Sequence, residues 1–122
     1  MHKFKMICLD IDRTLLNSEH KISPKTKVVI EIVANEKQIP VILVSARMPK
    51  GILFLQKELN IEQPIICYSG ALVMDEKAEI LSNCGIAILD VRQVYKFASE
   101  IGAHISLYKD DEWYWQENLL KK

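Results

Sequence analysis

Three short apolar runs, separated by stretches long enough for helices, constrain the fold of the first 70 residues more than any other feature. The runs cover residues 5–9, 41–44 and 64–68. Short, mostly apolar runs of this kind are typical of strands buried on both faces of a parallel sheet. The proline at position 64 is compatible with the third run because it stands at the first residue.

The two intervening stretches carry helix signals. Ser23 followed by Pro24 is a typical N-cap and first-turn pair, and an apolar stripe follows up to about residue 36, formed by Val28, Ile32 and Val33 with Val29 beside it. A second helix is expected from Pro49 to Asn60, with one apolar face made of Ile52, Leu55 and Leu59. The order strand-helix-strand-helix-strand predicts an α/β fold with part of a doubly wound, Rossmann-like parallel sheet.

The pattern changes after Gly70. Residues 71–74 and 79–82 read as a hairpin around a polar turn at 75–77. A helix capped by Asp90 and closed by Gly102 follows, and then two strands at 104–108 and 112–115 around a turn with Asp110 and Asp111. The sequence therefore predicts one module over residues 1–70 and the first part of another over residues 71–122.

Composition narrows the class of protein. Lys plus Arg and Asp plus Glu number 16 each, so the zero net charge argues against nucleic acid as a partner. Asp10, Asp12 and Arg13 interrupt the N-terminal apolar stretch too early for a signal peptide or membrane span. A soluble, cytoplasmic protein without membrane partners is expected. Its cysteines show no metal-binding spacing, and Cys8 and Cys67 are expected to be small core residues.

Polar residues follow each apolar run. Asp10 and Asp12 come after the first run. The second run is followed by Ser45, Ala46 and Arg47. Because ligands bind outside the carboxyl ends of parallel strands, these residues are expected to meet in one crevice. An alternative interpretation is that Ser45 and Arg47 only cap a helix and face solvent.

The segment Asp10-Ile11-Asp12-Arg13-Thr14 after a hydrophobic strand resembles the first motif, hhhhDxDGT, of the haloacid dehalogenase phosphatases, particularly their Cof-type branch. The resemblance implies that Asp10 is the nucleophile that forms an aspartyl-phosphate, and that Asp12 is the general acid and then the general base. It also implies a Mg²⁺ cofactor held by the Asp10 carboxylate and the backbone carbonyl of Asp12. The predicted enzyme is a phosphoric monoester hydrolase.

The later segments extend this resemblance. Val44-Ser45-Ala46-Arg47 is similar to the second motif, often Thr-Gly-Arg in the Cof-type branch, which implies phosphate or substrate binding by Thr14, Ser45, Ala46 and Arg47. Tyr68-Ser69-Gly70-Ala71 is close to the Asn-Gly-Ala element where Cof-type proteins leave the core for an inserted α/β cap. Small phosphorylated metabolites such as sugar phosphates are the implied substrates.

The chain departs from the family pattern at several points. Arg13 replaces the usual Gly, where it would strain the loop, enter the phosphate pocket or add a cation, and Ala46 replaces a second Gly. The third and fourth family motifs, which supply a Lys and further acidic metal ligands, have no counterpart here. The 122-residue chain alone is therefore expected to be inactive, as the first half of a truncated phosphatase.

Two other classes of protein are alternatives to a phosphatase. One is a non-catalytic remnant that acts only through association, such as a homodimer paired through the exposed sheet edge at residues 5–9. The other is a phospho-acceptor receiver domain, which needs an Asp after the third strand, where this chain has Cys67, Tyr68 and Ser69.

Overall fold

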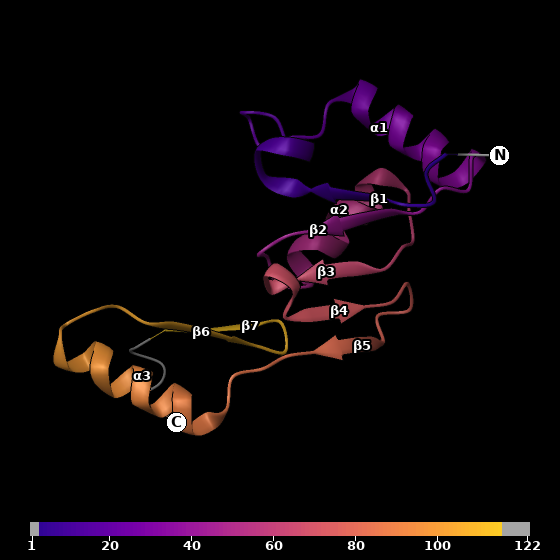
Figure 1. Cartoon of the computed structure of the whole chain (residues 1–122). Helices are drawn as coiled ribbons and strands as arrows, with labels where there is room; N and C mark the ends of the chain where they lie inside the picture. Colours follow the sequence, from indigo (N-terminus) through magenta and orange to yellow (C-terminus); the bar gives the residue numbers. More distant parts are fainter. Residues whose placement is uncertain (1–2, 116–122) are drawn as a thin grey trace. The chain divides into compact units, whose positions relative to one another are not determined.

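The computed structural model describes residues 3–115, and the chain divides into two compact units between Asn83 and Cys84 (Figure 1). The first unit contains a five-stranded sheet in the order β1-β2-β3-β4-β5. Its strands are β1 (Ile7–Asp10), β2 (Val41–Val44), β3 (Ile65–Cys67), β4 (Leu72–Met74) and β5 (Ile80–Asn83).

The first three strands confirm the predicted parallel sheet. β1 pairs with β2 in parallel, with Ile7 opposite Val41 and Asp10 opposite Val44, and β2 pairs with β3 in parallel. Both crossovers step across the sheet in the same direction. Right-handed crossovers of this kind bring both helices to the same face, so the described residues contain one helix layer of the Rossmann-like core.

The first crossover helix starts where the sequence predicted. The Ser23 hydroxyl accepts a hydrogen bond from the Thr26 amide at 3.2 Å and caps α1 (Pro24–Glu31), which continues into a wider turn at η2 (Ile32–Glu36). The predicted apolar stripe is only partly directed at the core: Val33 is partly buried against it, whereas Val28 is 53% exposed and Ile32 is 37% exposed. Ile30 and Ala34, one helical turn apart, are buried instead.

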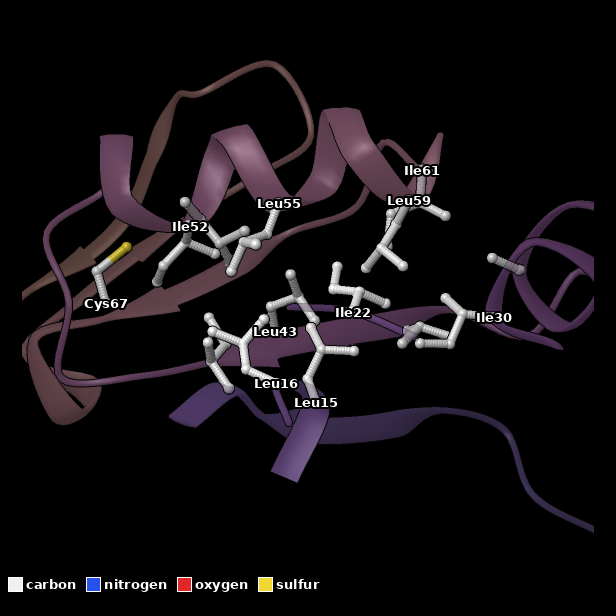
Figure 2. Close-up of a cluster of buried hydrophobic side chains, with 14 residues drawn as sticks. Leu15, Leu16, Ile22, Ile30, Leu43, Ile52, Leu55, Leu59, Ile61 and Cys67 are labelled. Atoms are coloured by element: carbon white, nitrogen blue, oxygen red, sulfur yellow. The ribbon is translucent and has the colours of Figure 1, made fainter. Parts of the chain in front are cut away.

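The core lies between the sheet and both helices (Figure 2). The second helix, α2 (Lys50–Leu59), buries the three residues predicted for its apolar face, Ile52, Leu55 and Leu59, and ends at Asn60 in the left-handed conformation. These side chains pack with Leu43, Ile65 and Cys67 of the sheet. Burial of this cluster is the main stabilising interaction of the first unit.

The hairpin after Gly70 belongs to this same sheet. β4 pairs antiparallel with β3, and β5 pairs antiparallel with β4. The first compact unit therefore extends to Asn83, beyond the change of pattern at Gly70, and the assignment of residues 71–122 to a cap stays a prediction. The unit extends this far because backbone hydrogen bonding between β3 and β4 continues the sheet, which the local turn pattern at 68–70 does not reveal. The antiparallel pair also argues against a receiver domain, which continues its strand-helix alternation.

The second unit contains α3 (Ile88–Glu100) and a hairpin of β6 (Ser106–Lys109) and β7 (Glu112–Trp115). The prediction that Asp90 caps this helix was wrong, since Ala87 is the N-cap, α3 starts at Ile88 and Asp90 lies in its first turn. A carboxylate is still favourable there because it faces the positive end of the helix dipole. Asp110 and Asp111 form the predicted turn, both with positive φ, as a two-residue hairpin of the type I′ class requires.

Cys67 is buried as predicted, but Cys8 is exposed, because it lies on the edge strand β1 and on the face of that strand away from the helices. Within residues 3–115, no helix is long and apolar enough to cross a membrane.

Candidate active site

The predicted site residues lie at the carboxyl ends of the parallel strands. Asp10 is the last residue of β1 and stands opposite Val44 in the ladder, so the loops after β1 and β2 start side by side. The loop after β2 is also tied to the end of β3. The Ser45 amide donates to the Ile66 carbonyl at 3.0 Å, and the Ser69 amide donates to the Ser45 carbonyl at 3.0 Å. The three strand ends therefore form one polar edge, as the parallel arrangement predicts.

A tight reversal of the main chain follows β1. Ile11 is fully buried, Asp12 has extended dihedral angles, and Arg13 has φ of 64° and ψ of 11° in the left-handed region. The Leu16 amide donates to the Ile11 carbonyl at 2.9 Å and closes the turn. Burial of Ile11 and Leu15 anchors the loop on the core, while Asp12 between them stays at the surface.

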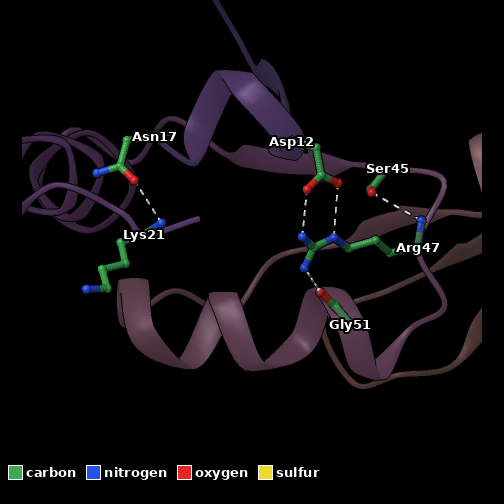
Figure 3. Close-up of polar contacts among 6 residues, drawn as sticks. All are labelled: Asp12, Asn17, Lys21, Ser45, Arg47 and Gly51. Atoms are coloured by element: carbon green, nitrogen blue, oxygen red, sulfur yellow. Dashed lines mark hydrogen bonds and ion pairs between the residues drawn. The ribbon is translucent and has the colours of Figure 1, made fainter. Parts of the chain in front are cut away.

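A bidentate ion pair joins this loop to the loop after β2 (Figure 3). Arg47 Nε donates to Asp12 Oδ2 at 3.1 Å, and Arg47 Nη2 donates to Asp12 Oδ1 at 2.7 Å. The side chain of Arg47 is 29% exposed and that of Asp12 is 53% exposed. A fork of this kind defines the orientation of both groups, although a pair so open to solvent contributes little net stability.

Ser45 and Arg47 do not have the capping role of the alternative interpretation. Ser45 is buried, and its hydroxyl accepts a hydrogen bond from the Arg47 amide at 3.1 Å. The residue before α2 is Pro49, and no side chain caps that helix. A Ser hydroxyl that accepts this bond still has its own O–H to donate. The loop can therefore present a donor to an anion.

The ion pair affects the protonation of Asp12. The hydrogen bond from Arg47 holds the pKa of the Asp12 carboxyl below its ordinary value, against a smaller opposite effect of desolvation, and the charges of Arg47 and His20 add to the lowering. The carboxylate form is therefore favoured. A carboxylate is the form that a general base needs.

The structure does not gather every predicted residue around this pair. Asp10 and Ala46 are exposed at the strand ends. Thr14 instead lines an apolar groove between β1 and α1, together with Ile7, Leu9, Leu15 and Val29. Asp12 and Arg47 were expected in the same crevice, but their direct ion pair was not predicted, because strand order does not specify which side chains of two loops 35 positions apart pair with each other.

The oxygen donors at the end of β1 are of the kind that Mg²⁺ prefers. An exposed carboxylate on Asp10 and the carbonyl of Asp12 are hard ligands, and Mg²⁺ commonly keeps several waters beside one or two carboxylates. Among residues 3–115, no group of three His, Cys, Asp or Glu side chains lies together as a ready metal site. The donors fit Mg²⁺ in chemical type and make up only part of its coordination.

Comparison with known proteins shows the family. The profile of the haloacid dehalogenase-like hydrolases matches residues 7–122. The chain belongs to this family. The resemblance deduced from the DxD segment is thereby confirmed, and the receiver-domain alternative is excluded.

Individual haloacid dehalogenase relatives are phosphatases by name. A Haemophilus influenzae protein named "Putative phosphatase" is 36% identical over 98 residues, which is 80% of this chain and 37% of that protein. The glucosyl-3-phosphoglycerate/mannosyl-3-phosphoglycerate phosphatase of Persephonella marina is 36% identical over 72 residues, which is 59% of this chain and 26% of that protein. The chain thus spans less than half the length of these relatives.

Solved structures agree with the fold. A haloacid dehalogenase-like hydrolase from Bacteroides thetaiotaomicron has a TM-score of 0.82 at 27% identity, over 93% of this chain and 44% of that one. The HAD subclass IIB sugar phosphatase BT4131 has a TM-score of 0.72 at 21% identity, over 90% of this chain and 43% of that one. At that identity the second likeness supports the fold alone.

Proposed function

We propose that these residues supply the nucleophile, the proton-transfer group and the phosphate-binding loop of a Mg²⁺-dependent phosphatase of small phosphorylated metabolites. The observation that carries the proposal is the adjacency of the β1 and β2 carboxyl ends, where Asp10 stands opposite Val44 and Ser45 follows directly. The proposal concerns a protein of the family's full length. Residues 1–70 would belong to its core, and the segment from residue 71 would lead into a cap.

The proposed reaction has two steps. The Asp10 carboxylate attacks phosphorus, the bond to the ester oxygen breaks, and the leaving oxygen takes a proton from Asp12. In the second step Asp12 removes a proton from water, the water oxygen attacks the aspartyl-phosphate, and the Asp10 carboxylate leaves with inorganic phosphate as the product. Ionised Asp12 is ready for the second step, while the first step requires Asp12 to carry a proton.

The chain's own residues divide the remaining tasks. The Ser45 hydroxyl and the amides of the 45–47 loop would donate to the phosphoryl oxygens, and the nearby N-terminus of α2 favours an anion. Bound Mg²⁺, held by the Asp10 carboxylate and the Asp12 carbonyl, would reduce the repulsion between the carboxylate and the phosphate dianion. A sugar phosphate is the proposed substrate class because a protein named as a sugar phosphatase shares the fold, and a relative in sequence is named as a phosphatase of glycosylated phosphoglycerates.

Replacing Asp10 by Asn tests the proposal. In a longer protein that contains these residues and the remaining family motifs, Asp10→Asn should reduce turnover by more than about a thousandfold, because a neutral amide does not attack phosphorus. Steady-state and burst hydrolysis of an activated aryl phosphate with Mg²⁺ would measure the effect. Near-normal turnover of Asp10→Asn would rule out the assigned nucleophile.

The 122-residue chain serves as a comparison in the same assay. It is expected to show little activity, because each missing electrostatic stabiliser typically costs about a hundredfold to a thousandfold. Robust Asp10-dependent turnover would mean that residues within this chain, or a second copy of it, complete the site.

Association without catalysis is a second candidate function. It is favoured by the position of β1 at the edge of the sheet within the described residues and by the apolar groove beside it. A free apolar edge is a common pairing surface.

A further inference from the structure

The Arg47 guanidinium is held by a second contact besides Asp12. Arg47 Nη1 donates to the carbonyl oxygen of Gly51 at 3.3 Å, in the first turn of α2. Together with the two bonds to Asp12, this contact uses three of the five N–H donors of the guanidinium. Arg47 is therefore fixed between the loop after β1 and the start of α2 (Figure 3).

Gly51 also gives this side chain the space that it occupies. A Cβ at position 51 would lie 3.3 Å from Arg47 Cβ and 3.6 Å from Arg47 Cδ. The other three glycines of the chain, Gly70, Gly85 and Gly102, have nothing within 4 Å of such a Cβ. A glycine inside a helix is unfavourable relative to alanine, so helix formation does not explain this residue. Its contact with Arg47 does.

The arrangement suggests a different task for Arg47 than phosphate binding. Both carboxylate oxygens of Asp12 accept from Arg47, so the orientation of Asp12 depends on where Arg47 is held. A planar guanidinium forms such a two-bond fork, whereas a lysine ammonium does not. Any displacement of Arg47 by a few tenths of an ångström would lengthen or tilt these bonds.

We propose that Gly51 and Arg47 are positioning residues for Asp12: Gly51 admits and anchors Arg47, and Arg47 in turn fixes the orientation of the Asp12 carboxylate. This inference rests on the proposed function, in which Asp12 transfers the proton. It assigns Arg47 to Asp12 and leaves phosphate binding to Ser45 and the loop amides.

The test uses nuclear magnetic resonance of the ¹⁵N-labelled 122-residue chain. In the wild type, the Arg47 Nε–H should exchange with water at least about tenfold more slowly than that of the exposed Arg92, because it is bonded to Asp12. Asp12→Asn should remove most of this protection. Gly51→Ala should speed the exchange at least about threefold and shift the Asp12 carboxyl ¹³C signal, because the added Cβ displaces Arg47.

Thermal stability separates positioning from a merely structural role. Gly51→Ala should leave the melting temperature unchanged or higher, because alanine favours the helix. Gly85→Ala is the matched control, since a Cβ there meets nothing within 4 Å, and it should leave the Arg47 signal unchanged. The proposal is overturned if Arg47 exchanges within about twofold of Arg92 in the wild type, or if Gly51→Ala leaves Arg47 unaffected.

Added inorganic phosphate with Mg²⁺ distinguishes this inference from the proposed function. Phosphate that shifts the Ser45 amide and leaves the Arg47 Nε–H in place supports both. Phosphate that displaces Arg47 from Asp12 overturns the positioning role. Phosphate that fails to shift the Ser45 amide counts against the proposed phosphate site, and the positioning role is then decided by the exchange measurements alone.

Discussion

At the scale of single residues, Arg13 adopts a backbone conformation that side chains with a Cβ disfavour. Its φ of 64° is in the left-handed region, which glycine adopts without the steric cost of a Cβ. The resemblance to the family motif places Gly at this position, and the structure shows the dihedral angle that explains this preference. Of the three effects considered for Arg13, loop strain is the one that its backbone geometry supports.

Replacing Arg13 should therefore change stability in opposite directions for two side chains. Arg13→Gly should raise the free energy of unfolding by up to about 1 kcal/mol, the relief of strain being offset partly by greater freedom of the unfolded chain. Arg13→Val should lower it by about 1 kcal/mol or more, because a β-branched residue is strongly disfavoured at positive φ. Urea denaturation of the three proteins measures both effects. A destabilised Arg13→Gly variant would contradict the prediction that strain at Arg13 outweighs the added freedom of the unfolded chain.

At the scale of elements, helix α1 presents two apolar stripes, only one of which enters the core. Ile30 is 8% exposed, whereas Val28 on the same helix is 53% exposed. The Ser23 cap fixes where the helix begins, but a cap does not determine how the helix rotates about its axis. Packing of Ile30 into the core cluster, near Val41 of the sheet, sets that rotation.

Alanine substitutions in the two stripes of this helix should differ in how much they lower the free energy of unfolding. Ile30→Ala is expected to lower the free energy of unfolding by about 2–4 kcal/mol, because it removes buried methyl groups and leaves a cavity. Val28→Ala should cost less than about 1 kcal/mol, because the Val28 side chain is already largely in solvent. Thermal or urea unfolding of both variants gives the comparison. Equal losses would mean that the Val28 stripe is covered by another part of the protein.

At the scale of the whole molecule, the outer edge of β1 is the surface through which the first unit is expected to meet other chains. β1 is an edge strand in the described sheet, and its residues Ile7 and Leu9 line an apolar groove with α1. Unpaired strand edges with apolar side chains promote strand pairing between molecules. The chain is expected to self-associate, most simply as a homodimer through this edge.

A charge placed on the edge should weaken this association. Sedimentation velocity over a dilution series should show a concentration-dependent dimer for the wild type. Ile7→Lys should raise the dissociation constant at least about tenfold, because a charged edge residue opposes pairing. Ser18→Lys adds the same charge in an exposed loop and should behave like the wild type. A compact monomer at every concentration would contradict the prediction.

The sequence by itself determined the order and type of the elements. Apolar runs, the Ser23-Pro24 cap, Asn60 and the Asp110-Asp111 turn act through neighbouring residues, so their effects can be deduced without knowing the fold. The strand-end positions of Asp10 and Ser45 followed from the same local signals. The family resemblance depended on these residues and was confirmed.

Other features were decided only by the tertiary structure. The burial of Ile30 instead of Val28, the exposure of Cys8 and the joining of β4 to β3 depend on which surfaces meet. The same is true of the site, where Arg47 reaches Asp12 across 35 residues and Gly51 makes room for it. Local sequence patterns indicate the secondary structure that a segment prefers by itself. Which side chains meet depends on packing and hydrogen bonding between segments distant in the sequence, because those contacts exist only after the chain has folded.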